Sequence, residues 1–131
     1  MRDSFLRQFK EEVNLFVEER DWSQFQTPKN LSMALAVESS ELLEIFQWLT
    51  ASESQEINNS AFPKKEIQNE LADILAYLLR LADVLEIDLE LAIQNKIAIN
   101  AKKYPAKGAK TPISKSLCRR ISCPKGIKEK V

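Results

Sequence analysis

Apolar side chains recur every three to four residues along most of the first 105 positions, which is the spacing of amphipathic helices. The periodicity predicts four helices, over residues 3–20, 31–50, 63–85 and 88–103. Asn30 precedes the second of these as a predicted N-cap, and Pro63 suits the first turn of the third. The segment 51–62 is polar, and no segment alternates as a half-buried strand would. The pattern therefore predicts an all-α fold, a bundle of four helices.

Length and composition limit the chain to one small core. It has 131 residues, of which 44% are hydrophobic, and this favours a single domain over residues 1–105. Residues 106–131 carry both glycines and an excess of Lys and Arg, so we predict a basic, poorly ordered tail with a short turn around 113–121. No apolar run approaches the length of a membrane span, and no membrane partner is expected.

The charges are unevenly distributed, although the formal net charge is zero. Residues 107–131 hold eight Lys or Arg and a single acidic residue, which leaves 11 basic and 18 acidic residues in 1–106. An acidic body repels polyanions unless a metal intervenes, so no specific nucleic-acid partner is expected. The two cysteines, Cys118 and Cys123, fit free thiols in a reducing cytoplasm, while a small disulfide or part of a metal site stays open.

Two pairs of carboxylates interrupt the apolar faces of the second and third predicted helices; they are Glu38, Glu41, Glu70 and Asp73. An ionised carboxylate out of water must be paired, metal-bound or protonated. The second predicted helix contains no Lys or Arg, and the chain has no His. Carboxylate oxygens without His or Cys suit Mg²⁺ or Mn²⁺. The structural alternative is a buried charge network with Arg80 and lysines.

Other short motifs lie in a fixed order around these carboxylates: Arg20-Asp21-Trp22, Phe25, Thr27-Pro28-Lys29-Asn30-Leu31, Phe46-Gln47-Trp48, Tyr77, Lys96, Asn100 and Lys103-Tyr104-Pro105. With them, residues 1 to about 105 resemble the all-α nucleoside triphosphate pyrophosphohydrolases, the MazG-like group that includes the dCTP pyrophosphatases. The resemblance implies that the four carboxylates ligate Mg²⁺, with Mn²⁺ as a substitute, and that water attacks the α-phosphorus. The products would be a nucleoside monophosphate and pyrophosphate.

The resemblance also implies a base pocket. Trp22 and Trp48 match aromatic residues that stack on the base, although each also fits an ordinary core position. Gln26 stands where relatives often carry His, and an amide can hydrogen-bond a base edge but cannot become a cation. The expected substrate is dCTP or a modified pyrimidine dNTP, with dUTP or phosphoribosyl-ATP as alternatives. Asn30 belongs to the same predicted substrate-binding set.

A phosphate-binding patch is predicted on the last helix. Lys96, Asn100 and Lys103 follow at i, i+4 and i+7 and so share one face, with Tyr104 adjacent. Such a patch complements phosphate oxygens, although a solvated helix end would look the same. Tyr77 could donate its hydroxyl to a phosphate or be a core tyrosine, and Lys29 is a further phosphate candidate.

The remaining expectations concern assembly and alternatives. Leu43 and Leu79 lie off the acidic faces, which predicts a homodimer or homotetramer. Glu44 is open between an additional metal ligand, a base and a solvated position. The alternative to an enzyme is a non-catalytic helical module that binds nucleotide or protein without turnover, and loss of a metal ligand would be its mark.

Overall fold

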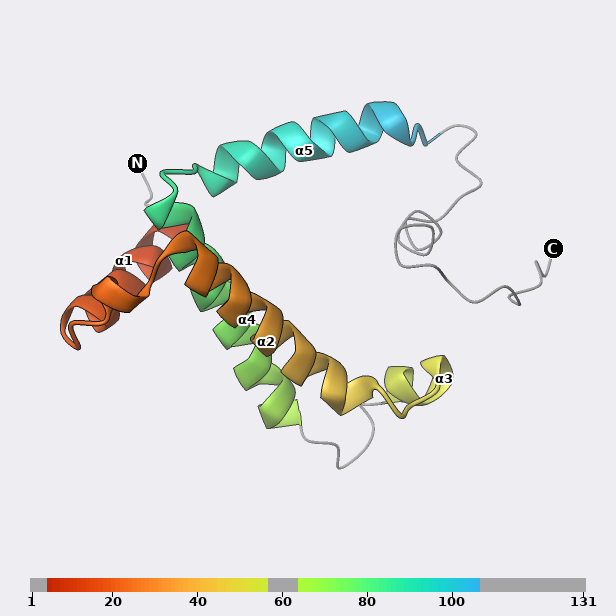
Figure 1. Ribbon diagram of the computed structural model, residues 1–131. Helices are drawn as coiled ribbons and strands as arrows, with labels where there is room; N and C mark the ends of the chain where they lie inside the picture. The colour runs from red at the N-terminus through yellow and green to blue at the C-terminus, as the bar shows by residue number, and fades with distance from the viewer. Residues whose placement is uncertain (1–4, 57–63, 107–131) are drawn as a thin grey trace. The chain divides into compact units, whose positions relative to one another are not determined.

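The computed structural model describes residues 5–56 and 64–106, and all regular structure in these ranges is helical (Figure 1). The elements are α1 (Phe5–Glu18), the 3-10 helix η1 (Ser23–Phe25), α2 (Pro28–Phe46), α3 (Ala51–Gln55), α4 (Lys64–Val84) and α5 (Leu89–Lys103). The all-α prediction is confirmed. Within the described ranges, no helix combines the length and the apolar composition that a membrane crossing requires.

The chain divides into two compact units, residues 1–89 and 90–131. The first holds α1 to α4, and the second holds nearly all of α5. The predicted domain boundary at residue 105 stays a prediction. The predictions for Pro63, for the turn around 113–121 and for the two cysteines fall outside the described residues.

One short helix, α3, and one cap differ from the sequence prediction. Residues 51–55 form α3 instead of an irregular linker, because Thr50 and Glu53 make a reciprocal capping box: Glu53 N donates to Thr50 Oγ1 and Thr50 N donates to Glu53 Oε2, at 3.2 and 2.7 Å. The predicted N-cap Asn30 is wrong. Thr27 caps α2 by accepting from Asn30 N at 3.2 Å, and Pro28 occupies the first turn, where its fixed φ suits a helix.

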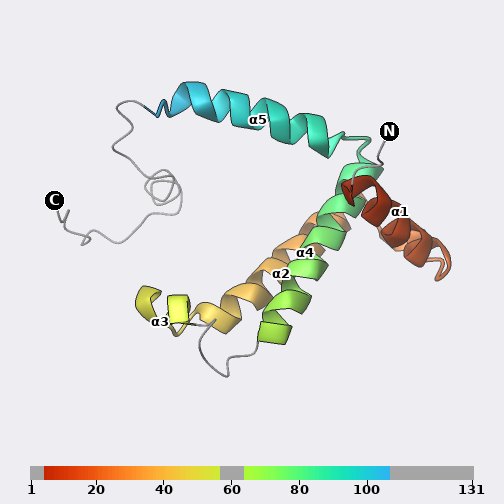
Figure 2. The ribbon, with the colours of Figure 1, turned by 180° about the vertical axis from the view of Figure 1, so that it is seen from behind.

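The first unit is built on α4. Helix α2 runs antiparallel to α4 and packs along it, while α1 packs against the C-terminal part of α4 (Figures 1 and 2). Among the described residues, four apolar side chains are buried: Val17, Leu31, Leu79 and Ala82. Burial of a leucine side chain contributes roughly 1.5–3 kcal/mol, so this small set is the principal apolar support of the unit. The prediction that Leu79 belongs to a surface for association is therefore wrong, because α4 buries it in the core of the unit.

A polar network joins α1 to the end of α4. Asn14 Nδ2 donates to Asp83 Oδ2 at 2.8 Å, and Lys10 Nζ lies 3.0 Å from Asp83 Oδ1. Burial alone would raise the pKa of Asp83, but the hydrogen bonds from Lys10 and Asn14 and the charges of Lys10 and Arg80 outweigh it and lower that pKa. Asp83 is therefore stabilised as an anion in the folded protein.

This network predicts an acid-sensitive contribution to stability. Because the folded-state pKa of Asp83 is lowered, its contribution is present above the unfolded pKa of about 4 and is lost as pH falls through the folded value. We expect Asp83→Asn to lower the free energy of unfolding by about 1–2 kcal/mol at neutral pH and to flatten its decline in acid. Urea denaturation across pH measures both effects. Glu19→Gln, at an exposed pair with Arg20, is the matched control, and an equal loss there would contradict the prediction.

Shortly after the ends of α1 and α4, the chain passes through a non-glycine residue in the left-handed region, Asp21 at φ 54° and Glu86 at φ 55°. At the end of α4, Ile87 N donates to Ala82 O at 2.8 Å and Glu86 N donates to Asp83 O at 3.0 Å, which is a Schellman termination. A Cβ in this conformation costs roughly 1–2 kcal/mol, and glycine avoids the cost.

We therefore expect Glu86→Gly to stabilise the protein by about 1 kcal/mol, although glycine usually destabilises. Thermal denaturation measures the change. The control is Glu12→Gly in the middle of α1, which should destabilise by about the same amount. Destabilisation by Glu86→Gly would show that its left-handed backbone is not limiting.

Candidate active site

Three glutamates from two helices meet on one face of the α2–α4 pair. Glu38 and Glu41 lie one turn apart on α2, and Glu70 lies on α4. One carboxylate oxygen from each lies within 4.8 Å of the other two. Three negative charges at this spacing are stable only with a bound cation or with bound protons. We call these three residues the carboxylate cluster.

The two half-buried members of the cluster hold protons more tightly than a carboxylate in water. Burial raises the pKa of Glu38, and the charges of Glu41 and Asp73 raise it further. Burial likewise raises the pKa of Glu70, again with Glu41 and Asp73 adding to the effect. Glu70 Oε2 is shielded from solvent and accepts no hydrogen bond from any described residue. The cluster thus has an orphaned acceptor that a cation would satisfy.

Asp73 lies one turn after Glu70 on α4, outside the cluster but near enough for its charge to act on both half-buried glutamates. Asp73 and Glu41 are exposed, so the prediction that all four carboxylates are sheltered is wrong for these two. The physical reason is that two packed helices leave one side of their contact line open to water. The assignment of Asp73 as a metal ligand stays a prediction.

Arg80, the cation of the structural alternative, points elsewhere. Its Nε donates to Gln26 Oε1 at 2.7 Å and its Nη1 donates to Asn14 Oδ1 at 2.9 Å. Nη1 also lies 3.6 Å from Asp83 Oδ2. Across residues 5–56 and 64–106, no Lys or Arg forms an ion pair with any of the four acidic candidates. A charge network with Arg80 therefore does not account for the carboxylates.

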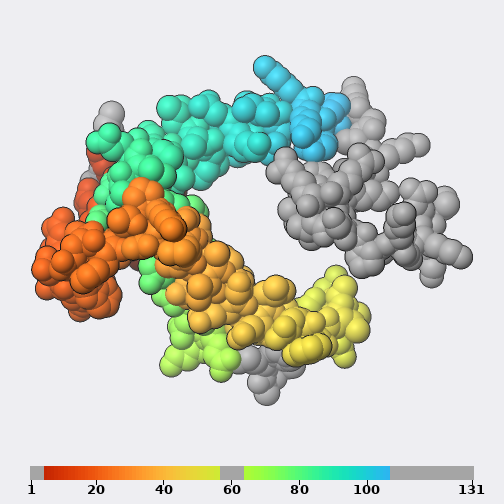
Figure 3. Space-filling view, viewed as in Figure 1, coloured from red at the N-terminus to blue at the C-terminus, as the bar shows by residue number. Residues whose placement is uncertain are grey.

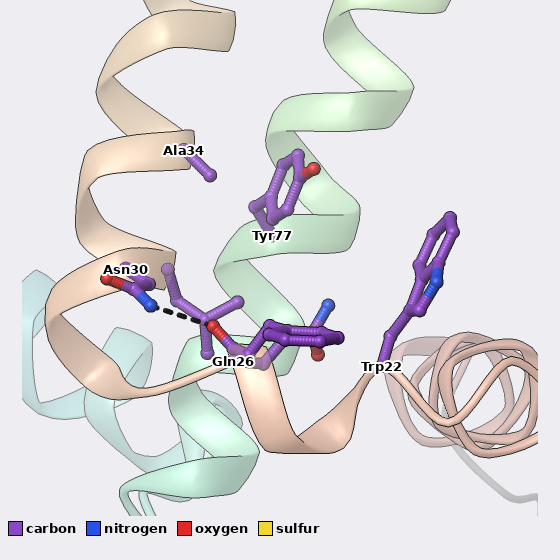
Figure 4. A pocket seen from close by; sticks show the side chains of 7 residues that line it. Trp22, Gln26, Asn30, Ala34 and Tyr77 are labelled. Carbon is purple, nitrogen blue, oxygen red and sulfur yellow. Dashed lines mark hydrogen bonds between the residues drawn. The ribbon is translucent and has the colours of Figure 1, made fainter.

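A pocket of about 300 Å³ lies between α2, α4 and the loop before α2, and Figure 4 shows the side chains that line it. Its lining comprises Trp22, Phe25, Gln26, Asn30, Leu31, Ala34 and Tyr77. A mostly apolar and aromatic lining with a few amides, at this volume, is typical of a small-molecule site. The flat rings offer stacking surfaces for a planar ligand such as a nucleobase.

The loop between α1 and α2 forms one wall of this pocket. The left-handed Asp21 reverses the chain, so that Trp22 N donates to Val17 O at 3.1 Å. The Trp22 ring then packs edge-on against Phe16, with ring centroids 5.8 Å apart, and is 47% exposed. Asn30 Nδ2 donates to Phe25 O at 2.9 Å, which fixes the loop to the first turn of α2.

Tyr77 connects the pocket to the carboxylates. It faces Ala34 across the pocket, and the two residues come from α4 and α2 (Figure 4). Burial raises the pKa of Tyr77, and the charges of Glu38 and Asp73 raise it further. Glu38 follows Ala34 by one turn, and Tyr77 follows Asp73 by one turn. Pocket and cluster therefore occupy neighbouring turns of the same helix pair.

Some predicted site residues do not lie at this pocket. Trp48 follows the end of α2, is 87% exposed and does not line it. Lys29 and Glu44 are exposed on α2 and lie outside both pocket and cluster. Their predicted roles stay predictions.

The phosphate patch belongs to the second unit and is described by itself. Lys96, Asn100 and Lys103 all lie on α5, where their spacing places them on one face. Tyr104 N donates to Asn100 O at 2.8 Å, and Lys103 Nζ lies 5.4 Å from the centre of the Tyr104 ring. The geometry within the patch matches the sequence prediction, while its role with phosphate stays a prediction.

Part of the pocket lies outside the predicted set of site residues. Phe25, Leu31 and Ala34 line it, and Arg80, which the sequence suggests only as a partner for carboxylates, bonds to the lining residue Gln26. Their register was available: Ala34 precedes Glu38 by four residues and Arg80 follows Tyr77 by three, so each continues a face already assigned to the site.

Comparison with known proteins identifies the family of this chain. The MazG-like family model matches residues 33–116. Human dCTP pyrophosphatase 1 is 44% identical over 96 residues, 73% of this chain and 56% of that protein. The mouse protein of the same name is 39% identical over 114 residues, 85% of this chain and 63% of that protein. The chain therefore spans little more than half the length of these curated relatives.

A solved structure shares the fold. The crystal structure of a pyrophosphatase from Archaeoglobus fulgidus superposes with a TM-score of 0.73 at 36% identity, covering 80% of this chain and 96% of that one. The family model covers more than half of the chain, and it includes all four acidic candidates. This chain belongs to the MazG-like family.

Proposed function

We propose that this protein is a divalent-metal-dependent nucleoside triphosphate pyrophosphohydrolase that converts a pyrimidine dNTP, dCTP or a modified form of it, to the monophosphate and pyrophosphate. The observation that carries the proposal is the position of the carboxylate cluster one helical turn from an aromatic pocket of about 300 Å³. A nucleotide has a flat base and a polyanionic tail, and the two parts of the site match these in order. The names of the relatives, dCTP pyrophosphatase and pyrophosphatase, support the same reaction.

The donor set fits Mg²⁺. The cluster offers carboxylate oxygens alone, one of them buried and unpartnered, and the chain contains no His. Hard oxygen donors favour Mg²⁺, with Mn²⁺ as a substitute. We propose Glu38, Glu41 and Glu70 as ligands, with Asp73 as the fourth. A bound ion would offset phosphate charge and lower the pKa of an attacking water.

The residues around the cluster would orient the substrate. Trp22 and Phe25 present ring faces to the base, and Gln26 offers its amide to the base edge. Tyr77 lies where the pocket meets the carboxylates, so its hydroxyl is placed to donate to the phosphate nearest the sugar. Burial, with the charges of Glu38 and Asp73, raises the pKa of Tyr77, so the phenol is protonated and able to donate.

Outside the pocket, we propose that Lys96, Asn100 and Lys103 bind the outer phosphates of the substrate. Tyr104 and Lys29 are proposed as further phosphate contacts. Trp48 is proposed as a second stacking residue. A Trp that is 87% exposed has ring faces free for another surface, and a second copy of the chain is one source of such a surface.

Assembly into a homodimer or homotetramer is part of the proposal. Large apolar side chains are exposed on α2, including Met33, Val37 and Leu43. Helix α2 lies at the molecular surface in the space-filling view of Figure 3. Apolar surface of this extent on a small unit favours association. A cytoplasmic location stays a prediction from the sequence.

The test is turnover of a panel of dNTPs and modified pyrimidine triphosphates, each with Mg²⁺ and with EDTA, with products resolved by anion-exchange chromatography. The proposal predicts monophosphate and pyrophosphate only with Mg²⁺, and the fastest turnover for a pyrimidine. Folded protein that binds nucleotide without turnover would instead favour the non-catalytic module.

A further inference from the structure

Arg80 is held by three side chains, one of which, Gln26, lines the pocket. Its side chain is only 12% exposed. It donates to Asn14 of α1 and to Gln26 of the loop before α2, at 2.9 and 2.7 Å, and its Nη2 lies 3.5 Å from Ser23 Oγ. An arginine with this many fixed partners has one orientation, because its donors form a rigid planar fork.

The bond to Arg80 determines which way the Gln26 amide faces. Arg80 Nε–H can only donate, so the Gln26 atom opposite it must be the oxygen, which accepts at 2.7 Å. The amide nitrogen then faces the other way, and Figure 4 shows it on the side of Tyr77 and Trp22. Within the described part of the chain, Gln26 Nε2 makes no hydrogen bond. Two N–H donors are thus presented to the pocket.

The second amide of the pocket has already committed one of its two N–H donors. Asn30 Nδ2 already donates to Phe25 O at 2.9 Å. The other five lining side chains are aromatic or aliphatic. Gln26 is therefore the side-chain amide in this lining with both N–H donors free, whereas Asn30 keeps only one.

We infer that Arg80 is a positioning residue that locks Gln26 as a hydrogen-bond donor, so that the pocket selects bases with an acceptor on the facing edge, such as the C2 carbonyl shared by cytosine and uracil. This inference rests on the proposed function and adds the polarity of base recognition. A free glutamine amide can turn over and offer either group, so an unlocked Gln26 would discriminate less. Adenine has ring-nitrogen acceptors but no carbonyl oxygen beside its glycosidic nitrogen, so it is the natural comparison.

Gln26→Glu tests the donor without disturbing the support. A carboxylate keeps the bond to Arg80, with charge assistance, but places an oxygen where Nε2 stood. We expect kcat/KM for dCTP and for dUTP to fall roughly ten- to hundredfold, through KM, with Tm unchanged or raised. Undiminished turnover of dCTP by this variant would overturn the inference, because recognition of the base would then need no donor at residue 26.

Arg80→Met tests the positioning role. With Gln26 free to turn, the ratio of kcat/KM for dCTP over dATP should fall roughly tenfold, and Arg80→Lys should restore part of it. In a Gln26→Ala background, Arg80→Met should leave that ratio unchanged, since the group it positions is gone. Lys10→Met is the matched control: it removes another cation of the same network, 3.0 Å from Asp83, and should lower Tm without altering the ratio.

The outcomes separate the two proposals. Wild-type protein that hydrolyses no nucleotide overturns the proposed function and this inference together. Wild-type turnover with an unaltered base ratio in Arg80→Met and in Arg80→Lys, whatever their Tm, overturns the inference alone. If Arg80→Met does not fold, Arg80→Lys and Gln26→Glu carry the same test.

Discussion

Glu38→Gln is expected to lower Mg²⁺-dependent hydrolysis by roughly a thousandfold or more, while the protein stays folded and helical. The change removes one ligand charge from a cluster whose oxygens lie within 4.8 Å of one another, but it keeps the size of the side chain. Asp73→Asn should have the same effect if Asp73 completes the ligand set. Steady-state kinetics at saturating nucleotide measures the loss, and circular dichroism verifies the fold.

A second readout separates metal binding from chemistry. In the metal-free wild-type protein, Glu41 and Asp73 repel the half-buried Glu38, so removal of its charge should raise Tm in EDTA. The same change should reduce the rise in Tm that Mg²⁺ gives, because a ligand that binds only the folded state stabilises it. Glu12→Gln, at an exposed position of α1, should change neither the Tm in EDTA nor the rise in Tm with Mg²⁺. Full turnover in Glu38→Gln would sink the metal assignment.

Leu79→Ala is expected to destabilise the protein by about 3 kcal/mol, the largest effect on stability of any single change proposed here. Leu79 is 2% exposed on α4, the helix on which both α1 and α2 pack. Truncation therefore leaves a cavity in a core with few other buried side chains. Chemical denaturation with a constant m-value measures the loss.

Leu43→Ala is the matched control, since Leu43 is 62% exposed on α2. In a monomer it should cost less than about 0.5 kcal/mol. If an assembly covers Leu43, the loss of stability in Leu43→Ala should depend on protein concentration. The loss in Leu79→Ala should persist at low concentration, because Leu79 is buried within a single chain. Equal and concentration-independent losses at both positions would contradict the described core.

The sequence predicts the long helices well because their apolar periodicity is strong and their ends carry local signals. Thr50 and Glu53 show the limit of prediction from periodicity. Their spacing is that of a capping box, yet the five-residue helix that follows is too short for a periodic pattern to be detected. The cap at Thr27 is ambiguous in the sequence for a different reason, because Asn30 is an equally good cap by residue type. Only the position of Pro28 in the first turn decides between them.

In the site, too, some features can be predicted from the sequence and others depend on packing. The paired spacing of Glu38 with Glu41, and of Glu70 with Asp73, places each pair on one helix face, which sequence can show. Which pair members are shielded depends on the packing of α2 on α4, and the sequence does not show that. Arg80 is the clearest case, because its partners Asn14 and Gln26 are 66 and 54 residues away along the chain.

The most direct test of the central claim is turnover of dCTP in [18O]water with Mg²⁺, with both products analysed by mass spectrometry. The account predicts dCMP that carries one labelled oxygen, unlabelled pyrophosphate, and no turnover with EDTA. Release of dCDP and orthophosphate, or label in the pyrophosphate, would contradict attack at the α-phosphorus.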